Sequence, residues 1–192
     1  MPLLVVEHIE GHIYANFLTG QRVKPPLVCL TVSGGHTDLL LIPRLGEYKI
    51  IGRTRDDAAG EAFDKVARVL GLPYPGGPQI EKLAMGGSKE AIAFPRGLQE
   101  AGNFDFSFSG LKTFALNYLN EAKQKGETVD LPDFAASFQW AIIDILTQKL
   151  MAAAELYQVE QVVLSGGVAA NSTFREHVQN QARERGLELL YP

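Results

Sequence analysis

Apolar and polar positions form two patterns along this chain, and the first is typical of β-strands. Two short apolar runs, L-V-C-L-T-V at residues 27–32 and D-L-L-L-I at residues 38–42, are separated by S-G-G-H-T. Short apolar runs bounded by turn residues are typical of buried strands, and a glycine pair between them favours a tight connection. The sequence therefore predicts a β-hairpin with a Gly-Gly tip.

The second pattern begins at Asp56, where apolar residues recur every three or four positions, which is the period of a helix. Acidic residues open this stretch and Gly71 follows its last turn, so we expect a capped helix. Residues 73–78, P-Y-P-G-G-P, predict a rigid irregular loop, and residues 79–84, Q-I-E-K-L-A, predict the start of another helix. Residues 86–110 are loop-rich.

A long amphipathic helix is predicted from about Pro132 to Gln158. Its apolar stripe, which core packing explains, consists of Phe134, Phe138, Ile142, Ile145, Leu146 and Leu150. Residues 161–178 then predict a strand, a Gly-Gly turn and a helix. Hairpin, helices and this strand-turn-helix unit together indicate an α/β fold.

The beginning of the chain has a different character. Residues 7–18 can form a short helix, and residues 19–26, T-G-Q-R-V-K-P-P, end in two prolines that favour an extended linker. We therefore place a domain boundary near residue 25.

Composition narrows the class of protein. With 192 residues, 46% of them hydrophobic, and a net charge of -4, the chain is expected to form one large domain or two small ones. Its single cysteine, Cys29, lies in an apolar run and is best explained as a small core residue in a reducing, cytoplasmic compartment. We expect no secretory leader and no membrane span. The mildly acidic balance argues against a protein that coats nucleic acids generally.

Two turns share the letters S-G-G, at residues 33–35 and 165–167, and each directly follows an apolar run. Glycine pairs let the backbone approach a ligand closely, and successive N–H groups in such turns bind anions. A tight turn alone would also explain either copy. Their recurrence predicts two phosphate or nucleotide loops that face one cleft.

Two further residues near these elements have competing explanations. Asn171 follows the second S-G-G turn, where its amide could bind a ribose or base or could cap the helix. Asp64 lies beside Lys65 on the predicted helix, and a solvated carboxylate paired with its basic neighbour is the default explanation.

The segment S-F-S-G-L-K-T at residues 107–113 is not a P-loop, because Leu111 stands between the glycine and the lysine. Ser109 and Lys112 could still touch a phosphate. A helix that starts here with Ser109 as its cap explains the pattern at least as well.

Two histidines, His8 and His12, are spaced to lie on one face of a helix and could bind one metal ion. The zinc-protease motif has its glutamate directly after the first histidine, whereas Glu10 comes two residues after His8 and points away. Protease chemistry is therefore disfavoured, while Glu7 could support the metal indirectly. Two partly exposed helix histidines are the alternative.

Six sequence blocks occur in order along almost the whole chain: H-I-E-G-H, T-V-S-G-G-H-T, D-D-A-A-G-E-A-F-D-K-V-A-R, Y-P-G-G-P, F-D-F-S-F-S-G-L-K-T and S-G-G-V-A-A-N. Together they resemble the TsaD family, the tRNA N6-adenosine threonylcarbamoyltransferases. The resemblance implies an α/β fold of the actin-like ATPase (ASKHA, ribonuclease H-like) type, mostly its second lobe. It also implies transfer of threonylcarbamoyl from threonylcarbamoyl-adenylate to N6 of the adenosine 3′ of the tRNA anticodon.

The resemblance implies a role for each matching residue, with no catalytic side chain beyond the metal site. His8 and His12 would hold one divalent metal ion, iron or zinc. The loop near the phosphate and the transferred group would be Thr31, Val32, Ser33, Gly34 and Gly35. The ribose and base of threonylcarbamoyl-adenylate, or of an ATP- or AMP-type nucleotide, would lie among Asp64, Gly77, Glu81, Gly167 and Asn171. This reverses the default explanation of Asp64.

Family members also carry an N-terminal strand motif like I-L-G-I-E-T-S-C-D and a later segment like C-T-D-N-A-A-M-I, whose aspartate completes the metal site. Neither occurs here, so we expect an internal piece that is inactive alone. Residues 1–24 would be the tail of the first lobe with the metal-ligand helix. Residues 25–192 would be the second lobe, with a helical insertion at about 54–130.

The implied partners are tRNA and TsaB-like and TsaE-like proteins, with no membrane. The alternative is a non-catalytic nucleotide-binding or scaffold paralogue of the same fold. The older label of metallo-endopeptidase is disfavoured by the position of Glu10.

Overall fold

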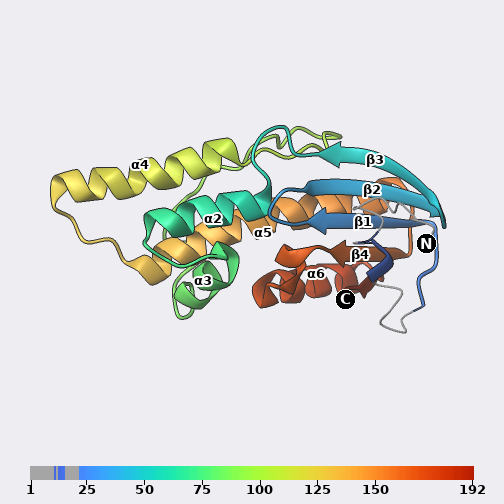
Figure 1. Ribbon diagram of the computed structural model, residues 1–192. Helices are drawn as coiled ribbons and strands as arrows, with labels where there is room; N and C mark the ends of the chain where they lie inside the picture. Colours follow the sequence, from blue (N-terminus) through green and yellow to red (C-terminus); the bar gives the residue numbers. More distant parts are fainter. Residues whose placement is uncertain (1–10, 12, 16–21) are drawn as a thin grey trace, which may run out of the picture.

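The computed structural model describes residues 11, 13–15 and 22–192, which form a five-stranded sheet with its helices (Figure 1). His8 and His12, and most of the helix predicted over residues 7–18, lie outside the described residues, so the metal site stays a prediction. Within the part of the chain that the structure describes, no helix combines the length and the apolar character needed to cross a bilayer.

The sheet has the strand order β3-β2-β1-β4-β5. Its strands are β1 Leu27–Val32, β2 Thr37–Arg44, β3 Glu47–Arg53, β4 Gln161–Ser165 and β5 Glu188–Leu190. The first three form an antiparallel meander, whereas β4 runs parallel to β1 and β5 runs parallel to β4. Val32 pairs with Thr37 across the turn at residues 33–36, so the predicted hairpin is confirmed.

The apolar pattern does not predict β3 or β5, for physical reasons. β3 is the solvated edge of the sheet, and only Gly52 of its residues is fully buried, so it has no apolar run. β5 has only three residues, which is too short to show a period.

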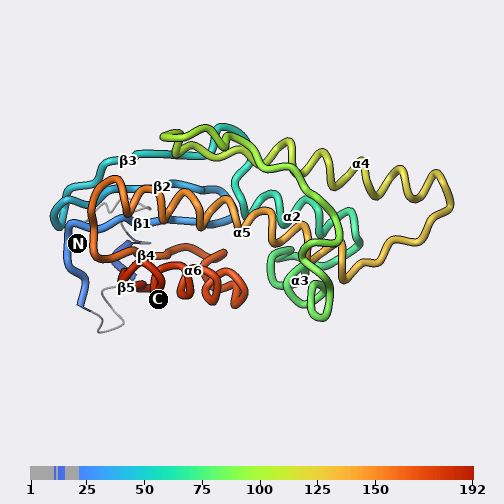
Figure 2. Tube along the Cα trace, turned by 180° about the vertical axis from the view of Figure 1, so that it is seen from behind, coloured from blue at the N-terminus to red at the C-terminus, as the bar shows by residue number. Residues whose placement is uncertain are grey.

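Helices cover one face of the sheet and continue past the ends of its strands (Figures 1 and 2). They are α2 Ala59–Val69, α3 Gly76–Leu83, α4 Ser109–Lys125, α5 Leu131–Leu156, the short 3₁₀ helix η2 Gly167–Ala170 and α6 Ser172–Glu184. The long predicted helix is confirmed as α5, and its whole apolar stripe is buried. Asp130 caps this helix by accepting a hydrogen bond from the Asp133 N–H at 3.0 Å.

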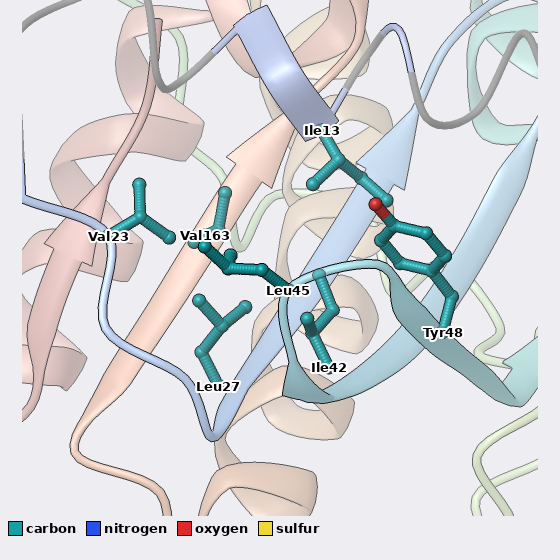
Figure 3. A pocket seen from close by; sticks show the side chains of 7 residues that line it. All are labelled: Ile13, Val23, Leu27, Ile42, Leu45, Tyr48 and Val163. Atoms are coloured by element: carbon teal, nitrogen blue, oxygen red, sulfur yellow. The ribbon is translucent and has the colours of Figure 1, made fainter. Parts of the chain in front are cut away.

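The opposite face of the sheet carries a smaller apolar cluster. It consists of Ile13, Leu27, Cys29, Leu40, Ile42, Val163 and Leu190. Figure 3 shows Ile13 lying over the sheet beside Tyr48, around a cavity of only about 10 Å³. Ile13 and Val23 are therefore packed on the sheet, and the Lys24 N–H also donates to Oε1 of Gln161 on β4 at 2.8 Å. The division of the chain into lobes near residue 25 stays a prediction.

Several local predictions need correction. α3 begins at Gly76, inside the stretch predicted to be an irregular loop. α2 begins at Ala59, whose N–H donates to the Thr37 hydroxyl at 2.9 Å, so Asp56 at the start of the predicted helix does not cap it. Gly71 does follow the helix with a positive φ of 72°, as predicted.

Asp56 instead caps α4 from a distance. Its carboxylate accepts from the N–H groups of Phe108 and Ser109 at 2.8 and 3.2 Å, and from the hydroxyls of Ser107 and Ser109 at 2.6 and 2.8 Å. Ser109 is thus the first residue of α4 and not its cap, which corrects that alternative. Burial would raise the pKa of Asp56, but these hydrogen bonds outweigh it and hold the pKa below its usual range.

Candidate functional site

The two S-G-G turns lie at the same end of the sheet, where the strands β1 and β4 stop. One follows β1 and the other follows β4, and because these strands are parallel neighbours, their carboxyl ends lie together. Ligands of open α/β sheets bind at the carboxyl ends of the strands. The first turn is closed by a hydrogen bond from the Ser33 N–H to the His36 carbonyl at 2.8 Å, and the Ser33 hydroxyl accepts from the His36 N–H at 3.1 Å.

Glycine stands at these positions of the turns for different physical reasons. Gly166 has a φ of 86°, and a Cβ atom there would lie 2.3 Å from the Val32 carbonyl oxygen, so this position requires glycine. At Gly34 and Gly167, in contrast, a Cβ would meet nothing within 4 Å. A side chain at either position would therefore extend into open space.

A cavity of about 430 Å³ lies beside the two turns. Its lining residues come from the turns, α2, α3 and the two residues before it, η2 and the cap residue of α6: Gly34, Gly60, Phe63, Asp64, Tyr74, Pro75, Gly77, Pro78, Glu81, Gly167, Val168, Ala170 and Asn171. This size lies within the range of small-molecule sites. The structure therefore brings both S-G-G turns to one cavity, as the sequence predicts.

Six of the ten residues expected to contact substrate line this cavity: Gly34, Asp64, Gly77, Glu81, Gly167 and Asn171. Ser33 and Gly35 belong to the first turn but are not in the cavity wall. Thr31 and Val32 are fully buried in β1 below it. Sequence reasoning missed the apolar wall, although the Y-P-G-G-P block that supplies part of it is conspicuous in the sequence.

Asp64 faces the cavity from α2. Its Oδ1 accepts a hydrogen bond from the Gly76 N–H at 2.7 Å, which ties α3 to α2. The default explanation of Asp64 as a partner of Lys65 is wrong, because the Lys65 ammonium contacts Asp57 at 2.8 Å and Glu61 at 2.7 Å. Within the described residues, Oδ2 of Asp64 takes part in no hydrogen bond or ion pair.

Asn171 and Glu81 form another part of the wall. The Asn171 Oδ1 accepts from the Phe174 N–H at 2.8 Å, so the helix-cap explanation is confirmed, and its Nδ2 donates to Oε1 of the buried Gln139 at 2.8 Å. Oε1 of Glu81 accepts from the Ser172 N–H at 2.7 Å and from the Ser172 hydroxyl. These contacts fix α6 against α3 and α5.

Below the turns, three polar groups form a closed cluster between β1 and β4. The Thr31 and Ser165 hydroxyls are 2.8 Å apart, and the Cys29 sulfur lies 3.9 Å from Thr31 Oγ1 and 3.8 Å from Ser165 Oγ. Burial raises the pKa of the Cys29 thiol to about 11, so the thiol is protonated at neutral pH. Thr31 therefore anchors the strand, and its hydroxyl is not presented to the cavity.

The basic residue considered for phosphate contact is engaged elsewhere. Lys112 forms an ion pair with Asp57, which also binds Lys65. Burial opposes ionisation of Asp57, but its two lysine partners hold its pKa below the usual range. With the Ser109 hydroxyl bound to Asp56, neither Ser109 nor Lys112 is directed at a phosphate.

The metal prediction gains no support from the described part of the chain. Within residues 11, 13–15 and 22–192, no three His, Cys, Asp or Glu side chains converge as a metal site would require. His8 and His12 lie outside these residues.

Comparison with protein families matches all of residues 1–192 to the family described as "TsaD: tRNA N6-adenosine threonylcarbamoyltransferase". A curated relative of that name from Desulfitobacterium hafniense (strain Y51) is 53% identical over 192 residues, which are 100% of this chain and 56% of the relative. One from Clostridium botulinum (strain 657 / Type Ba4) is 50% identical over 191 residues, again 100% and 56%. The chain thus spans 56% of the length of these relatives.

Solved structures show the same fold at low sequence identity. Full-length HypF, in its phosphate- and nucleotide-bound form, has a TM-score of 0.72 at 14% identity. The match covers 100% of this chain and 40% of the HypF chain. Component A of the (R)-2-hydroxyglutaryl-CoA dehydratase of Acidaminococcus fermentans has a TM-score of 0.51 at 16% identity, with coverages of 86% and 54%. With the sheet order above, these likenesses confirm the α/β class and the actin-like fold.

Proposed function

Because this chain belongs to the TsaD family, we propose that it forms the nucleotide-holding lobe of a tRNA N6-adenosine threonylcarbamoyltransferase. The reaction would move threonylcarbamoyl from threonylcarbamoyl-adenylate to N6 of the adenosine 3′ of the anticodon. The observation that carries this proposal is the cavity at the ends of β1 and β4, where two glycine turns, two carboxylates and an apolar wall meet.

Each part of the cavity suits one part of a nucleotide. N–H groups of the turns at Gly34 and Gly167, which line the cavity, would stabilise the negative charge of a phosphate. Asp64 and Glu81 supply carboxylate oxygens, the acceptors that ribose hydroxyls need. Pro75 and Val168 add apolar surface on which a base can lie.

The reaction needs no nucleophilic side chain from the protein. The carbonyl carbon of threonylcarbamoyl-adenylate is already activated, so the N6 amine attacks it. The bond to the phosphate oxygen and one N–H bond of the amine break, and AMP and a proton leave. Backbone N–H groups of the S-G-G turns would stabilise charge on the phosphate and on the developing oxyanion. A divalent metal ion, iron or zinc, held by His8 and His12, would act as a Lewis acid when bound.

We propose tRNA and TsaB-like and TsaE-like proteins as partners, and the cytoplasm as the compartment. Support comes from family membership. Because the relatives are longer than this chain, the direct test measures nucleotide binding by the cavity that this chain itself forms.

The test is calorimetric titration of the chain with AMP. Asp64→Asn and Glu81→Gln each remove a charged acceptor, and hydrogen bonds to charged groups contribute about 1.5–3 kcal/mol, so each should weaken binding about 10- to 150-fold. Glu121→Gln, on the exposed side of α4, is the control for loss of one negative charge. No AMP binding by the wild-type chain, or equal affinity in all four proteins, would refute the proposal.

A further inference from the structure

Tyr74 stands out among the residues of the cavity wall. It is 84% exposed, the highest value among the large apolar side chains of the described residues, yet it lines the cavity. Single exposed apolar residues are common on protein surfaces. What distinguishes Tyr74 is that an exposed ring stands at the mouth of a site whose proposed ligand has a planar aromatic base.

The turn that carries Tyr74 is firmly attached to α2. Gly76 packs so closely that a Cβ there would lie 2.7 Å from both the Ala67 Cβ and the Asp64 Cα. The Gly76 N–H also donates to Asp64 at 2.7 Å. Since Pro75 leaves little backbone freedom in between, the backbone of Tyr74 is held beside the cavity before any ligand arrives. A ring carried on a fixed backbone loses less entropy on binding than a ring on a mobile loop.

The distribution of polar groups in the cavity points to the part of the ligand that meets this ring. Gly34 and Gly167 offer the backbone of the two turns, and Asp64 and Glu81 offer carboxylates. Tyr74 offers a ring face, and neither a phosphate nor a ribose matches it as well as a purine does. Base and aromatic rings stack without needing hydrogen bonds.

We propose that Tyr74 stacks on the purine base of the nucleotide in this cavity and thereby fixes the base while the carboxylates hold the ribose. This inference rests on the proposed nucleotide site and adds a binding residue to it. The ring is what acts, and the hydroxyl is dispensable.

The experiment compares Tyr74→Ala, Tyr74→Leu and Tyr74→Phe with the wild-type chain. AMP affinity is measured by titration, and ribose 5-phosphate, which lacks the base, is measured by its displacement of AMP. We expect Tyr74→Phe to bind AMP within about twofold of wild type and Tyr74→Ala about tenfold more weakly. Tyr74→Leu should lie between them, and ribose 5-phosphate should be unaffected by any of the three.

Two controls separate binding from folding. Met85→Ala removes another highly exposed apolar side chain, at 76%, that is not in the cavity wall, and it should leave AMP affinity unchanged. All variants should keep the unfolding temperature of the wild type, because Tyr74 and Met85 are exposed.

The outcomes distinguish the two proposals. If the wild-type chain does not bind AMP, the proposed function fails and the stacking inference falls with it. If AMP binds and Tyr74→Ala binds it equally well, the stacking inference alone is overturned. The same holds if Tyr74→Ala weakens ribose 5-phosphate as much as AMP, because Tyr74 would then act on the sugar and phosphate and not on the base.

Discussion

The same substitution at two adjacent glycines of α3 should affect stability differently. At Gly76 an added methyl group would meet α2, with the Ala67 Cβ at 2.7 Å and the Phe63 carbonyl oxygen at 2.8 Å. At Gly77 the same group would meet nothing within 4 Å, but it would stand in the wall of the cavity. Gly76→Ala therefore tests the packing of α3 on α2, and Gly77→Ala tests the space left for a ligand.

The expected sizes follow from the contacts. Overpacking in a well-filled interior costs about 1–3 kcal/mol, so Gly76→Ala should unfold about 2–12 °C below wild type for a chain of this size. Gly77→Ala should keep or slightly raise stability, because alanine is more favourable than glycine in a helix by up to about 1 kcal/mol. Both should weaken AMP binding, since Gly76→Ala displaces the N–H that holds Asp64 and Gly77→Ala narrows the cavity.

Denaturant unfolding and AMP titration of the same three proteins check this prediction. The informative pattern is a loss of both properties at Gly76 and a loss of binding alone at Gly77. A Gly76→Ala protein as stable as wild type would show that α3 does not pack on α2 as described. Unchanged AMP affinity in Gly77→Ala would place the nucleotide elsewhere.

Two further substitutions test the support of the site. Gln139→Leu removes the acceptor of the Asn171 amide and should cost about 1–3 kcal/mol in denaturant unfolding, whereas Gln124→Leu on exposed α4 should cost little. Asp56 has a lowered pKa when folded, so its stabilisation is complete above the unfolded value of about 3.9 and is lost as pH falls through the folded value. Asp56→Ala should therefore be less stable at pH 7 and lose less on acidification, and an acid titration identical to wild type would contradict this.

The fold was predictable where burial leaves a clear period. The hairpin, α5 and the strand-turn-helix unit at the C-terminal side carry continuous or helical apolar patterns, and all three are confirmed. β3 was not predictable because an edge strand exposed to solvent needs no apolar run. The start of α3 was hidden because Gly76 and Gly77 are poor helix formers, and tertiary packing on α2 overrides that preference.

The site was predictable at the level of turns but not of individual bonds. Glycine pairs after two strands indicate anion-binding turns, and parallel pairing of those strands brings them together. Nothing in local sequence shows that Asp56 caps a helix that begins at Ser109, or that Asn171 is held by Gln139. Such bonds join residues far apart in the chain, so only the tertiary structure reveals them. The place of Tyr74 in the cavity wall and its exposure likewise follow only from the tertiary structure.

The two cavity carboxylates also hold the structure together, which decides how they must be tested. Asp64 anchors α3 to α2 through Oδ1, and Glu81 anchors α3 to α6 through Oε1. Each carboxylate has a second oxygen, so the same group can anchor a helix and receive a ribose hydroxyl. Alanine at either position would remove both functions, and lost nucleotide binding could then reflect a displaced helix. The amide variants keep an oxygen that can accept from Gly76 or Ser172 while removing the charge, and a loss of AMP affinity at unchanged stability in those variants identifies the ligand contact itself.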